Sequence, residues 1–342
     1  MDQTLLQDTV SFRPAAKRAY PTVSVLVPSY NHAHYIGRAL SALAAQTRAP
    51  DEILIIEDAS TDDSLAVVES FFDELPQLRV LRNPGNLGVN GAVNRGLLEA
   101  SGSHVVCSAA DDWLEPEFIA RMTEAVAAYP AGKVCVSSYV QYFETDRRRV
   151  HHRHDSELGA WYAADCPEYF CPDEFRELLA HGFVWLPLNA ALVEREALLD
   201  IHGCDPRLRW HSDWFATYTL AFRHGFIVVP EPLSVFRVAS KGYSGSGMRN
   251  PAFQRQVCAA IYDKLSDPEF ADIREALRKY PVAMTTFFRP MAQMLALRPR
   301  EWPYLASLAR WWVNEAAHGR RPGVLRNLAA RFGNPFGTGA RA

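Results

Sequence analysis

The chain has 342 residues, 48% of them hydrophobic and 22% charged, which is typical of a globular protein with one large domain or two of moderate size. The formal net charge of −3 at pH 7 gives no general reason to expect nucleic-acid binding. No run of about 18 apolar residues occurs, and the opening MDQTLLQDTVSFRP lacks the basic start and apolar centre of a signal peptide. We therefore expect a cytoplasmic protein without a membrane-spanning helix.

Short apolar runs alternate with segments of helical periodicity from Val23 onward. In the first expected helix, Ile36, Leu40 and Leu43 share one face, and the second should carry Leu65, Val68 and Phe72 inward. Strands are expected at 23–27, 52–58, 78–83 and 104–109, and helices at 33–46, after the N-cap segment STDDS, and at 88–100. Apolar strands that alternate with amphipathic helices predict an α/β fold, with a mostly parallel sheet covered by helices on both faces.

The second half of the chain is less regular. A strand is expected at 133–143, followed by an exposed hairpin or loop at 144–157. His151, His152 and His154 lie in that loop among arginines that would repel a cation, so we interpret the segment as solvated rather than metal-binding. Residues 173–240 return to mixed helix and strand.

The C-terminal region, 250–320, is expected to be helical, and the last residues, from 333, to be disordered. One apolar stripe in this region contains Trp302, Leu305, Leu308, Trp311 and Trp312. Packing against the main domain and contact with an anionic lipid surface both fit that stripe. The six cysteines form no CxxC pair and are interpreted as free thiols in a reducing compartment: Cys107, Cys135, Cys166, Cys171, Cys204 and Cys258.

Polar residues follow the apolar strands where each strand ends. In an open parallel sheet these positions face a common crevice where ligands bind. They are Ser29, Tyr30 and Asn31, then Glu57 and Asp58, then Asp111 and Asp112. Asp is also favoured in turns, but two strands ending in acids favour a binding site. A carboxylate pair suits Mg²⁺ or Mn²⁺, which prefer one or two carboxylates plus waters and phosphates.

Four segments carry a resemblance in their order along the chain. The first is VSVLVPSYNHAHYIGRALSALAAQT, with Pro28, Tyr30 and Asn31. The second is IIEDASTDDS, with Asp58, and the fourth is SAADDWLEP, with Asp111 and Asp112. The third is NPGNLGVNGAVNRGLLEASG, in which the matching positions are Asn86, Gly88, Asn94 and Gly96. Together these segments resemble glycosyltransferase family 2, whose members have the GT-A type nucleotide-diphospho-sugar transferase fold.

The resemblance implies a nucleotide-sugar donor, UDP-linked by family habit, and a divalent cation, Mn²⁺ or Mg²⁺. It implies that Asp58 accepts a hydrogen bond from the nucleotide base and that Asp111 and Asp112 hold the metal. The first acid of the family's metal motif is replaced by Ala109, so a weaker ribose contact is expected. The remaining positions expected to bind the donor are Pro28, Tyr30, Asn31, Asn86 and Asn94.

Two later segments extend the resemblance. GCDPRLRWHSDWFATYTLAFRHG (203–225) resembles the segment that carries the family's catalytic acid, and Asp213 matches that acid. It is expected to take the proton from the acceptor hydroxyl, although Asp213 could instead cap its helix. VVPEPLSVFRVASKGYSGSG (228–247) resembles the loop that closes over the donor, where Arg237 and Lys241 would meet phosphate. Ala239 stands where relatives place a metal-binding His.

The acceptor pocket is expected to include residues 183–196, with Trp185, Asn189 and Trp210 as candidates because aromatic faces and amides suit sugar rings. The expected activity is transfer of a sugar, with inversion, to a hydroxyl of a glycan or lipid-linked acceptor in bacterial cell-surface polysaccharide synthesis. The alternative is a noncatalytic sugar-nucleotide or carbohydrate-binding subunit with a degenerate metal site. A dehydrogenase is disfavoured because no GxGxxG follows the first strand.

The expected organisation has four parts. They are an N-terminal extension (1–21), a nucleotide-sugar-binding half (22–130), an acceptor and catalytic-base half (131–248), and a helical C-terminal extension (249–342) that could contact the inner membrane surface. The central expectation is that Asp58, Asp111 and Asp213 gather in one pocket.

Overall fold

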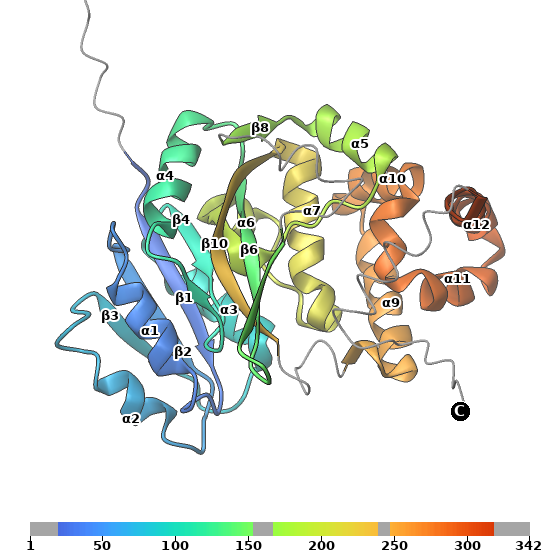
Figure 1. Cartoon of the computed structure of the whole chain (residues 1–342). Coiled ribbons are helices and arrows are strands. Elements are labelled where there is room, and N and C mark those ends of the chain that lie inside the picture. The colour runs from blue at the N-terminus through green and yellow to red at the C-terminus, as the bar shows by residue number, and fades with distance from the viewer. Residues whose placement is uncertain (1–19, 153–166, 239–246, 318–342) are drawn as a thin grey trace, which may run out of the picture.

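A central mixed β-sheet organises the chain (Figure 1). The computed structural model describes residues 20–152, 167–238 and 247–317. Within them the sheet has ten strands in the order β3-β2-β1-β4-β9-β6-β10-β5, with β7 beside β6 and β8 beside β10. The strands are β1 (Val23–Ser29), β2 (Glu52–Glu57), β3 (Leu78–Arg82), β4 (His104–Cys107), β5 (Trp113–Leu114), β6 (Val134–Phe143), β7 (Arg148–His152), β8 (Glu168–Phe170), β9 (Ala191–Glu194) and β10 (Phe226–Val238).

The first four strands are parallel, as the sequence predicts, and their carboxyl ends meet at one edge. Ser29 pairs with Glu57 at the ends of β1 and β2, and Leu26 pairs with Cys107 at the end of β4. The second half of the sheet is mixed, because β9 is antiparallel to both β4 and β6 whereas β6 and β10 are parallel. The residues that follow β1, β2 and β4 therefore share one edge of the sheet.

Helices cover both faces of the sheet and continue beyond it (Figure 1). The α-helices are α1 (Ile36–Ala44), α2 (Ser64–Glu69), α3 (Gly88–Glu99), α4 (Phe118–Ala128), α5 (Pro172–His181), α6 (Arg195–Asp200), α7 (Ser212–His224), α9 (Pro251–Ser266), α10 (Ala271–Lys279), α11 (Phe288–Ala296) and α12 (Trp302–Ala317). Short 3₁₀ segments are η1 (Leu188–Ala190), η2 (Pro206–His211), η3 (Pro268–Phe270), η4 (Pro281–Phe287) and η5 (Pro299–Glu301).

Alternate residues of the buried strands feed two cores, because successive strand side chains point to opposite faces. On one face, Val25 and Ile55 pack with Leu40 of α1 and Phe118 of α4. On the other, Leu26, Leu54 and Ile56 pack with helices α3, α6 and α7. This second core is the larger one, and it continues into the C-terminal helices.

The C-terminal helices pack on the main domain. Val257 and Ile261 of α9 are buried in the same cluster as Phe215 of α7. The ammonium group of Lys264, 8% exposed, lies 3.6 Å from the Asp205 carboxylate. Packing against the main domain is therefore found for α9. The apolar stripe at 302–312 lies on α12, which contacts α10 and α11, and a lipid contact of that stripe stays a prediction.

Two predictions about apolar faces are wrong. Phe72 is 45% exposed, because α2 ends at Glu69 and the residues after it leave the helical face. Trp302 is 56% exposed and does not share the buried stripe of α12, where Leu308 is fully buried. Leu305 and Trp311 are partly buried against the core.

Other predicted features are found in the described residues. The 144–157 segment begins as a hairpin, since β7 pairs antiparallel with β6. His154, Cys166 and the end of the chain from 318 lie outside the described residues. The five described cysteines are free thiols. No helix in the described ranges is both long and apolar enough to cross a membrane.

Candidate active site

The loops that follow β1 and β2 are bound to each other. The backbone N–H of Asn31 donates to the Ser60 hydroxyl at 3.1 Å, and the Asn31 side-chain oxygen accepts from the Thr61 N–H at 2.8 Å. The next residue, His32, donates its N–H to the Ser64 hydroxyl at 2.8 Å. Asn31 has a φ of 55°, a left-handed conformation that Asn tolerates better than most residues. These contacts fix the shape of the edge at which β1 and β2 end.

Pro28 is buried in β1, and Tyr30 is exposed at the edge. Tyr30 is therefore accessible to a ligand whereas Pro28 is not, and the role of both in donor binding stays a prediction. The N–H of Tyr30 donates to Nδ1 of His32 at 3.2 Å, which orients the imidazole beside the loop.

Asp58 is a buried carboxylate, 2% exposed, that holds the start of α3. One oxygen accepts from the Asn83 amide at 2.6 Å and from the Leu87 N–H at 2.9 Å, and the other accepts from the Gly88 N–H at 2.9 Å. Gly88 has a φ of 73°, which only glycine adopts without strain. Asn86 also accepts from the Gly88 N–H, at 2.9 Å. Asp58 thus shapes the turn between β3 and α3.

Asn94 is bound to a distant turn. Its amide donates to the Cys204 carbonyl at 2.8 Å and accepts from the Cys204 N–H at 2.7 Å. A Cβ at Gly203, whose φ is 64°, would lie 2.4 Å from the Asn94 side-chain oxygen. Both polar atoms of Asn94 therefore position the turn that leads toward α7. A contact between Asn94 and a donor stays a prediction.

The carboxylates of Asp111 and Asp112 meet one residue of β10. The Arg237 guanidinium donates to Asp111 at 2.8 Å, and the Arg237 backbone N–H donates to Asp112 at 2.8 Å. The same guanidinium donates to Glu144 at 2.9 Å and lies 3.8 Å from the centroid of the Tyr35 ring. Arg237 thus supplies a positive charge to a cluster of three acids.

Asn189 completes this cluster from η1. Its side-chain N–H donates to the second oxygen of Asp112 at 2.8 Å, so both oxygens of Asp112 accept hydrogen bonds. Burial and the neighbouring Asp111 carboxylate raise the pKa of Asp112 to about 7. Burial also lowers the pKa of His32, against the opposing effect of the nearby Asp111 charge. The β1 loop, the end of β4, η1 and β10 therefore converge here.

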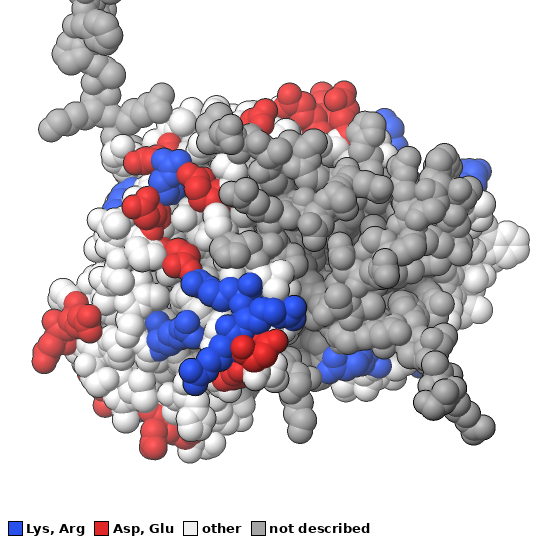
Figure 2. Space-filling view, viewed as in Figure 1, with Lys and Arg blue, Asp and Glu red and all other residues white. Residues whose placement is uncertain are grey.

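Basic side chains gather on one face over α1 and the β6–β7 hairpin (Figure 2). Two arginines of the hairpin have acidic partners: Arg148 lies 3.5 Å from Asp146, and Arg149 pairs with Glu115. These two arginines therefore bring little unbalanced charge to the neighbouring acidic cluster.

Asp213 lies in the first turn of α7, half-buried, where it accepts a hydrogen bond from the Trp214 N–H at 2.7 Å. Thr217, one turn later, donates to the Leu186 carbonyl at 2.9 Å. Since Asn189 lies three residues after Leu186 and reaches Asp112, α7 is tied to the acidic cluster through the 186–189 segment. Asp58 holds the first turn of α3, which includes Asn90. The Asn90 amide donates to the Arg209 carbonyl at 2.8 Å, so Asp58 is connected to η2, the segment that precedes α7. Asp58, Asp111 and Asp213 thus belong to one network of contacts, and a shared pocket for them stays a prediction.

The aromatic candidates differ in their surroundings. Trp185 is half-buried, with its ring 6.0 Å from that of Phe183. Trp210 is 9% exposed, and a Cβ at Gly247 would lie 2.1 Å from its ring, so the Gly247 backbone covers one face of the indole. That packing explains the glycine, and it leaves the Trp210 ring less open than a sugar platform requires. Lys241 and Ala239 lie outside the described residues.

A divalent cation fits this cluster only together with a ligand that brings phosphates. Among the described residues, no group of three or more His, Cys, Asp and Glu side chains is arranged to hold a metal. Both oxygens of Asp112 are engaged, whereas Asp111 uses one oxygen for Arg237. Mg²⁺ and Mn²⁺ accept one or two carboxylates when substrate phosphates and waters complete the shell. Asp111 is therefore the residue best placed to hold such an ion.

Three features of this cluster were absent from the sequence prediction: His32, Tyr35 and Glu144. His32 and Tyr35 stand in the SYNHAHY segment directly after β1, so their place at the sheet edge was the available signal. Glu144 follows β6 and carried no such signal. Its contact with Arg237 depends on the parallel pairing of β6 with β10.

Known proteins resemble this chain in sequence and in fold. The model of "Glycosyl transferase family 2" matches residues 24–185. An uncharacterized glycosyltransferase of Nostoc sp., alr2836, is 26% identical over 220 residues, which are 63% of this chain and 64% of that protein, so the match spans less than two thirds of that relative.

Two solved structures share the fold. TarS 1-349 of S. aureus in complex with UDP-GlcNAc superposes with a TM-score of 0.59 and 19% identity, over 84% of this chain and 79% of that one. The mannosyltransferase PcManGT of Pyrobaculum calidifontis, in complex with GDP-Man and Mn²⁺, gives a TM-score of 0.55 and 20% identity, over 91% of this chain and 80% of that one.

Proposed function

Because the chain belongs to glycosyl transferase family 2 and has the GT-A type α/β fold, we propose that it transfers a sugar from a nucleotide-diphosphate donor to a hydroxyl acceptor. The observation that carries the proposal is the convergence of Asp111, Asp112, Asn189 and Arg237 at the edge where β4 ends. Acids and a guanidinium at that edge suit a ligand that brings both phosphates and a cation.

The donor side of the site is assigned to the loops after β1, β2 and β3. The loop held by Asn31 and the turn held by Asp58 would form the walls of the nucleotide pocket. Uridine is the proposed base, by analogy with the UDP-GlcNAc bound to TarS, and the GDP-Man complex of PcManGT makes guanosine the competing choice. The proposed donor contacts also include Pro28 and Tyr30 near the start of the chain and Arg237 of β10.

Departure of the nucleotide is assigned to the acidic cluster. Asp111 would hold Mn²⁺ or Mg²⁺, which offsets the negative charge that develops on the leaving diphosphate. Asp112 would orient this arrangement, since its two oxygens are bound to Arg237 and Asn189. The Arg237 guanidinium, now on Asp111, could turn toward the diphosphate and donate to it.

Attack of the acceptor is assigned to Asp213. The Asp213 carboxylate, in the first turn of α7, would take the proton from the acceptor hydroxyl as that oxygen attacks the anomeric carbon. A single displacement of this kind inverts the anomeric centre and needs no covalent intermediate. We further propose that the acceptor is a glycan or lipid-linked saccharide of the bacterial cell envelope.

The proposal is tested by nucleotide release from a panel of UDP- and GDP-sugars with Mn²⁺ or Mg²⁺. At least one donor should be turned over, by transfer or slow hydrolysis. Asp213→Asn should lower that rate by about 10²–10⁴, the usual contribution of a general base, and should leave nucleotide binding in a thermal-shift assay intact.

The matched control is Asp173→Asn, because Asp173 also lies in the first turn of a helix but is 90% exposed. That variant should keep full turnover. Binding of a donor without any turnover would instead favour a noncatalytic sugar-nucleotide-binding subunit. Full turnover by Asp213→Asn would remove Asp213 from its proposed role.

A further inference from the structure

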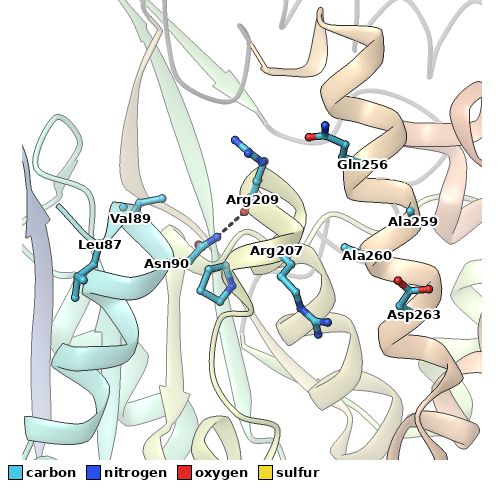
Figure 3. Close-up of a pocket in the computed structure, with 11 residues that line it drawn as sticks. Leu87, Val89, Asn90, Arg207, Arg209, Gln256, Ala259, Ala260 and Asp263 are labelled. Carbon is cyan, nitrogen blue, oxygen red and sulfur yellow. Dashed lines mark hydrogen bonds between the residues drawn. The ribbon is translucent and has the colours of Figure 1, made fainter.

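A groove outside the acidic cluster runs along one side of the contact between the main domain and α9. It has a volume of about 640 Å³ and lies between the start of α3, η2 and α9 (Figure 3). Leu87 and Val89, 50% and 43% exposed, form its apolar side. Arg209 of η2 and Gln256 of α9 also line it (Figure 3).

The groove adjoins both halves of the proposed site. Leu87 donates its backbone N–H to Asp58, so one wall of the groove is also the wall of the proposed nucleotide pocket. Arg209 stands four residues before Asp213, the proposed base, at the point where η2 leads into α7. A ligand in this groove would therefore contact the turn that Asp58 holds and the η2 segment that leads into α7.

Arg209 has a strained backbone. Its φ of 50° and ψ of −121° interrupt η2, in a conformation that side chains other than glycine rarely adopt. The hydrogen bond from the Asn90 amide to the Arg209 carbonyl holds this conformation (Figure 3). Strain that the surrounding structure maintains is concentrated at functional sites, where it aims a side chain.

The Arg209 guanidinium forms no ion pair with any residue that the structure describes, and it lies 5.0 Å from the centroid of the Phe253 ring. In contrast, Arg207 on the same 3₁₀ segment is bound to Asp205 at 2.6 Å. Asp263, the acid of the groove, lies close enough to Arg207 to affect its pKa. One end of the groove is thus balanced, and the end at Arg209 is positive.

The start of α3 adds no free charge to this end. The first turn of α3 contains no acid, but the Leu87 and Gly88 N–H groups already donate to the Asp58 carboxylate. The groove therefore combines an unpaired guanidinium with exposed apolar side chains.

We propose that this groove binds the acceptor and that Arg209 recognises an anionic group on it, a phosphate or a carboxylate, while Leu87 and Val89 contact its apolar surface. This inference rests on the proposed function, since it assigns the acceptor class of the same site. The hydrogen bond from Asn90 holds the Arg209 backbone in place, and so Arg209 is a specificity-determining residue of this groove.

The test uses inorganic phosphate and acetate as probes, with saturating UDP present to fill the donor side. Intrinsic tryptophan fluorescence reports binding, because Trp210 follows Arg209 directly. Phosphate or acetate should bind the wild-type protein, and Arg209→Gln should weaken that binding about tenfold or more, as loss of one charge-assisted hydrogen bond implies. Phosphate binding alone indicates a phosphorylated acceptor, and preference for acetate indicates a carboxylate.

Two further variants separate charge from folding. Arg209→Gly removes the guanidinium and the backbone strain together, so it should lose anion binding while its melting temperature stays the same or rises. Arg255→Gln, which removes an exposed arginine of α9 outside the groove, should bind the probes as the wild type does.

The inference is overturned if neither anion binds, or if Arg209→Gln and Arg209→Gly bind as tightly as the wild type. Failure of the proposed function has a different signature, because no UDP or nucleotide sugar would then bind or turn over. In that case phosphate and acetate are titrated without UDP in an Arg237→Gln variant. Anion binding that depends on Arg209 would still support an anion site in the groove, and absence of such binding would overturn that site.

Discussion

The ends of β2 and β4 both place acids at the same edge of the sheet, but they balance the charge in different ways. Asp58, after β2, is buried and accepts three hydrogen bonds from Asn83, Leu87 and Gly88, all within 30 residues of it. Asp111, after β4, is 30% exposed and pairs with Arg237, which lies 126 residues further along the chain.

The difference distinguishes a carboxylate whose hydrogen-bond partners are fixed, Asp58, from one whose charged partner can be exchanged, Asp111. Neutral donors on a short segment hold Asp58, and moving them would unfold the start of α3. A single guanidinium holds Asp111. A metal cation can take its place beside the carboxylate, while a diphosphate accepts from the guanidinium instead. Carboxylates of equal charge at one sheet edge can thus serve as a structural support and as a ligand site.

The largest expected effect is that of Asp111→Asn on turnover. Loss of the carboxylate should lower kcat roughly a thousandfold in the presence of Mn²⁺, since charge stabilisation by a bound metal is worth several kcal/mol. Initial rates of nucleotide release measure it. Asp146→Asn, which removes an exposed acid of the hairpin, is the control and should keep the wild-type rate. If Asp111→Asn keeps more than a tenth of the wild-type rate, Asp111 does not hold a metal that turnover requires.

The next effect is the pH dependence of stability. It tests whether the negative charges of Asp111 and Asp112, at the end of β4, are left uncompensated when no metal is bound. The pKa of Asp112, 3.8 in an ordinary setting, is raised to about 7 by burial and by Asp111. The folded protein therefore binds more protons than the unfolded chain between these values, and this group's contribution to stability is lost as pH rises through the window. Each unit of pKa corresponds to about 1.4 kcal/mol, so a shift of about three units contributes about 4 kcal/mol at most.

Urea unfolding at pH 5 and pH 8 with EDTA measures this contribution. Asp112→Asn should gain stability relative to the wild type at pH 8 and lose that advantage at pH 5. Comparing the two proteins at each pH removes the titration of the histidines, which is common to both. Equal pH dependence in the two proteins would mean that Asp112 is already charged in the folded state.

A smaller effect is expected from Asp58→Asn, at the fixed end. The new amide would face backbone N–H groups that need an acceptor, and a buried group left without its partner costs about 1–3 kcal/mol. The free energy of unfolding at pH 7 should fall by about that amount. Asp51→Asn is the control, because Asp51 accepts from the Val23 N–H at 2.8 Å but is exposed. Equal losses in both variants would show that burial gives Asp58 no special role.

The fold was predictable where the sequence signal is local. The apolar runs of β1, β2 and β4 predict buried parallel strands, because such strands need apolar side chains on both faces. Their ends then place Asp58 and Asp111 at one edge without any tertiary information. Helical faces were less certain, and Phe72 was assigned wrongly because its apolar spacing continues past the end of α2.

The partners of the site residues could not be predicted from spacing. Asn189 and Asp112 are 77 residues apart, and Asn94 and Cys204 are 110 apart. Family resemblance marked several of these positions but not the contacts they make, which depend on how η1 and the turn before η2 pack on the sheet. The strained conformation of Arg209 carried no signal at all, since glycine would be expected there.

The smallest expected effect, that of Arg237→Gln, sharpens the comparison most. If the guanidinium donates to the donor diphosphate, its loss should raise the donor KM about tenfold, the value of one charge-assisted hydrogen bond. The Arg237 guanidinium competes with Mn²⁺ for the Asp111 carboxylate. Without it, the half-maximal rate should need a lower Mn²⁺ concentration than in the wild type. Rates measured over a grid of donor and Mn²⁺ concentrations separate the two effects.

Arg149→Gln is the matched control for Arg237→Gln, because Arg149 also pairs with an acid, Glu115, but on the outer hairpin. It should change neither constant. A higher Mn²⁺ requirement in Arg237→Gln would show that the guanidinium organises Asp111 for the metal instead of competing with it. The partners of Asp111, after β4, would then be as permanent as those of Asp58, after β2, because Arg237 would stay bound to Asp111 throughout the reaction.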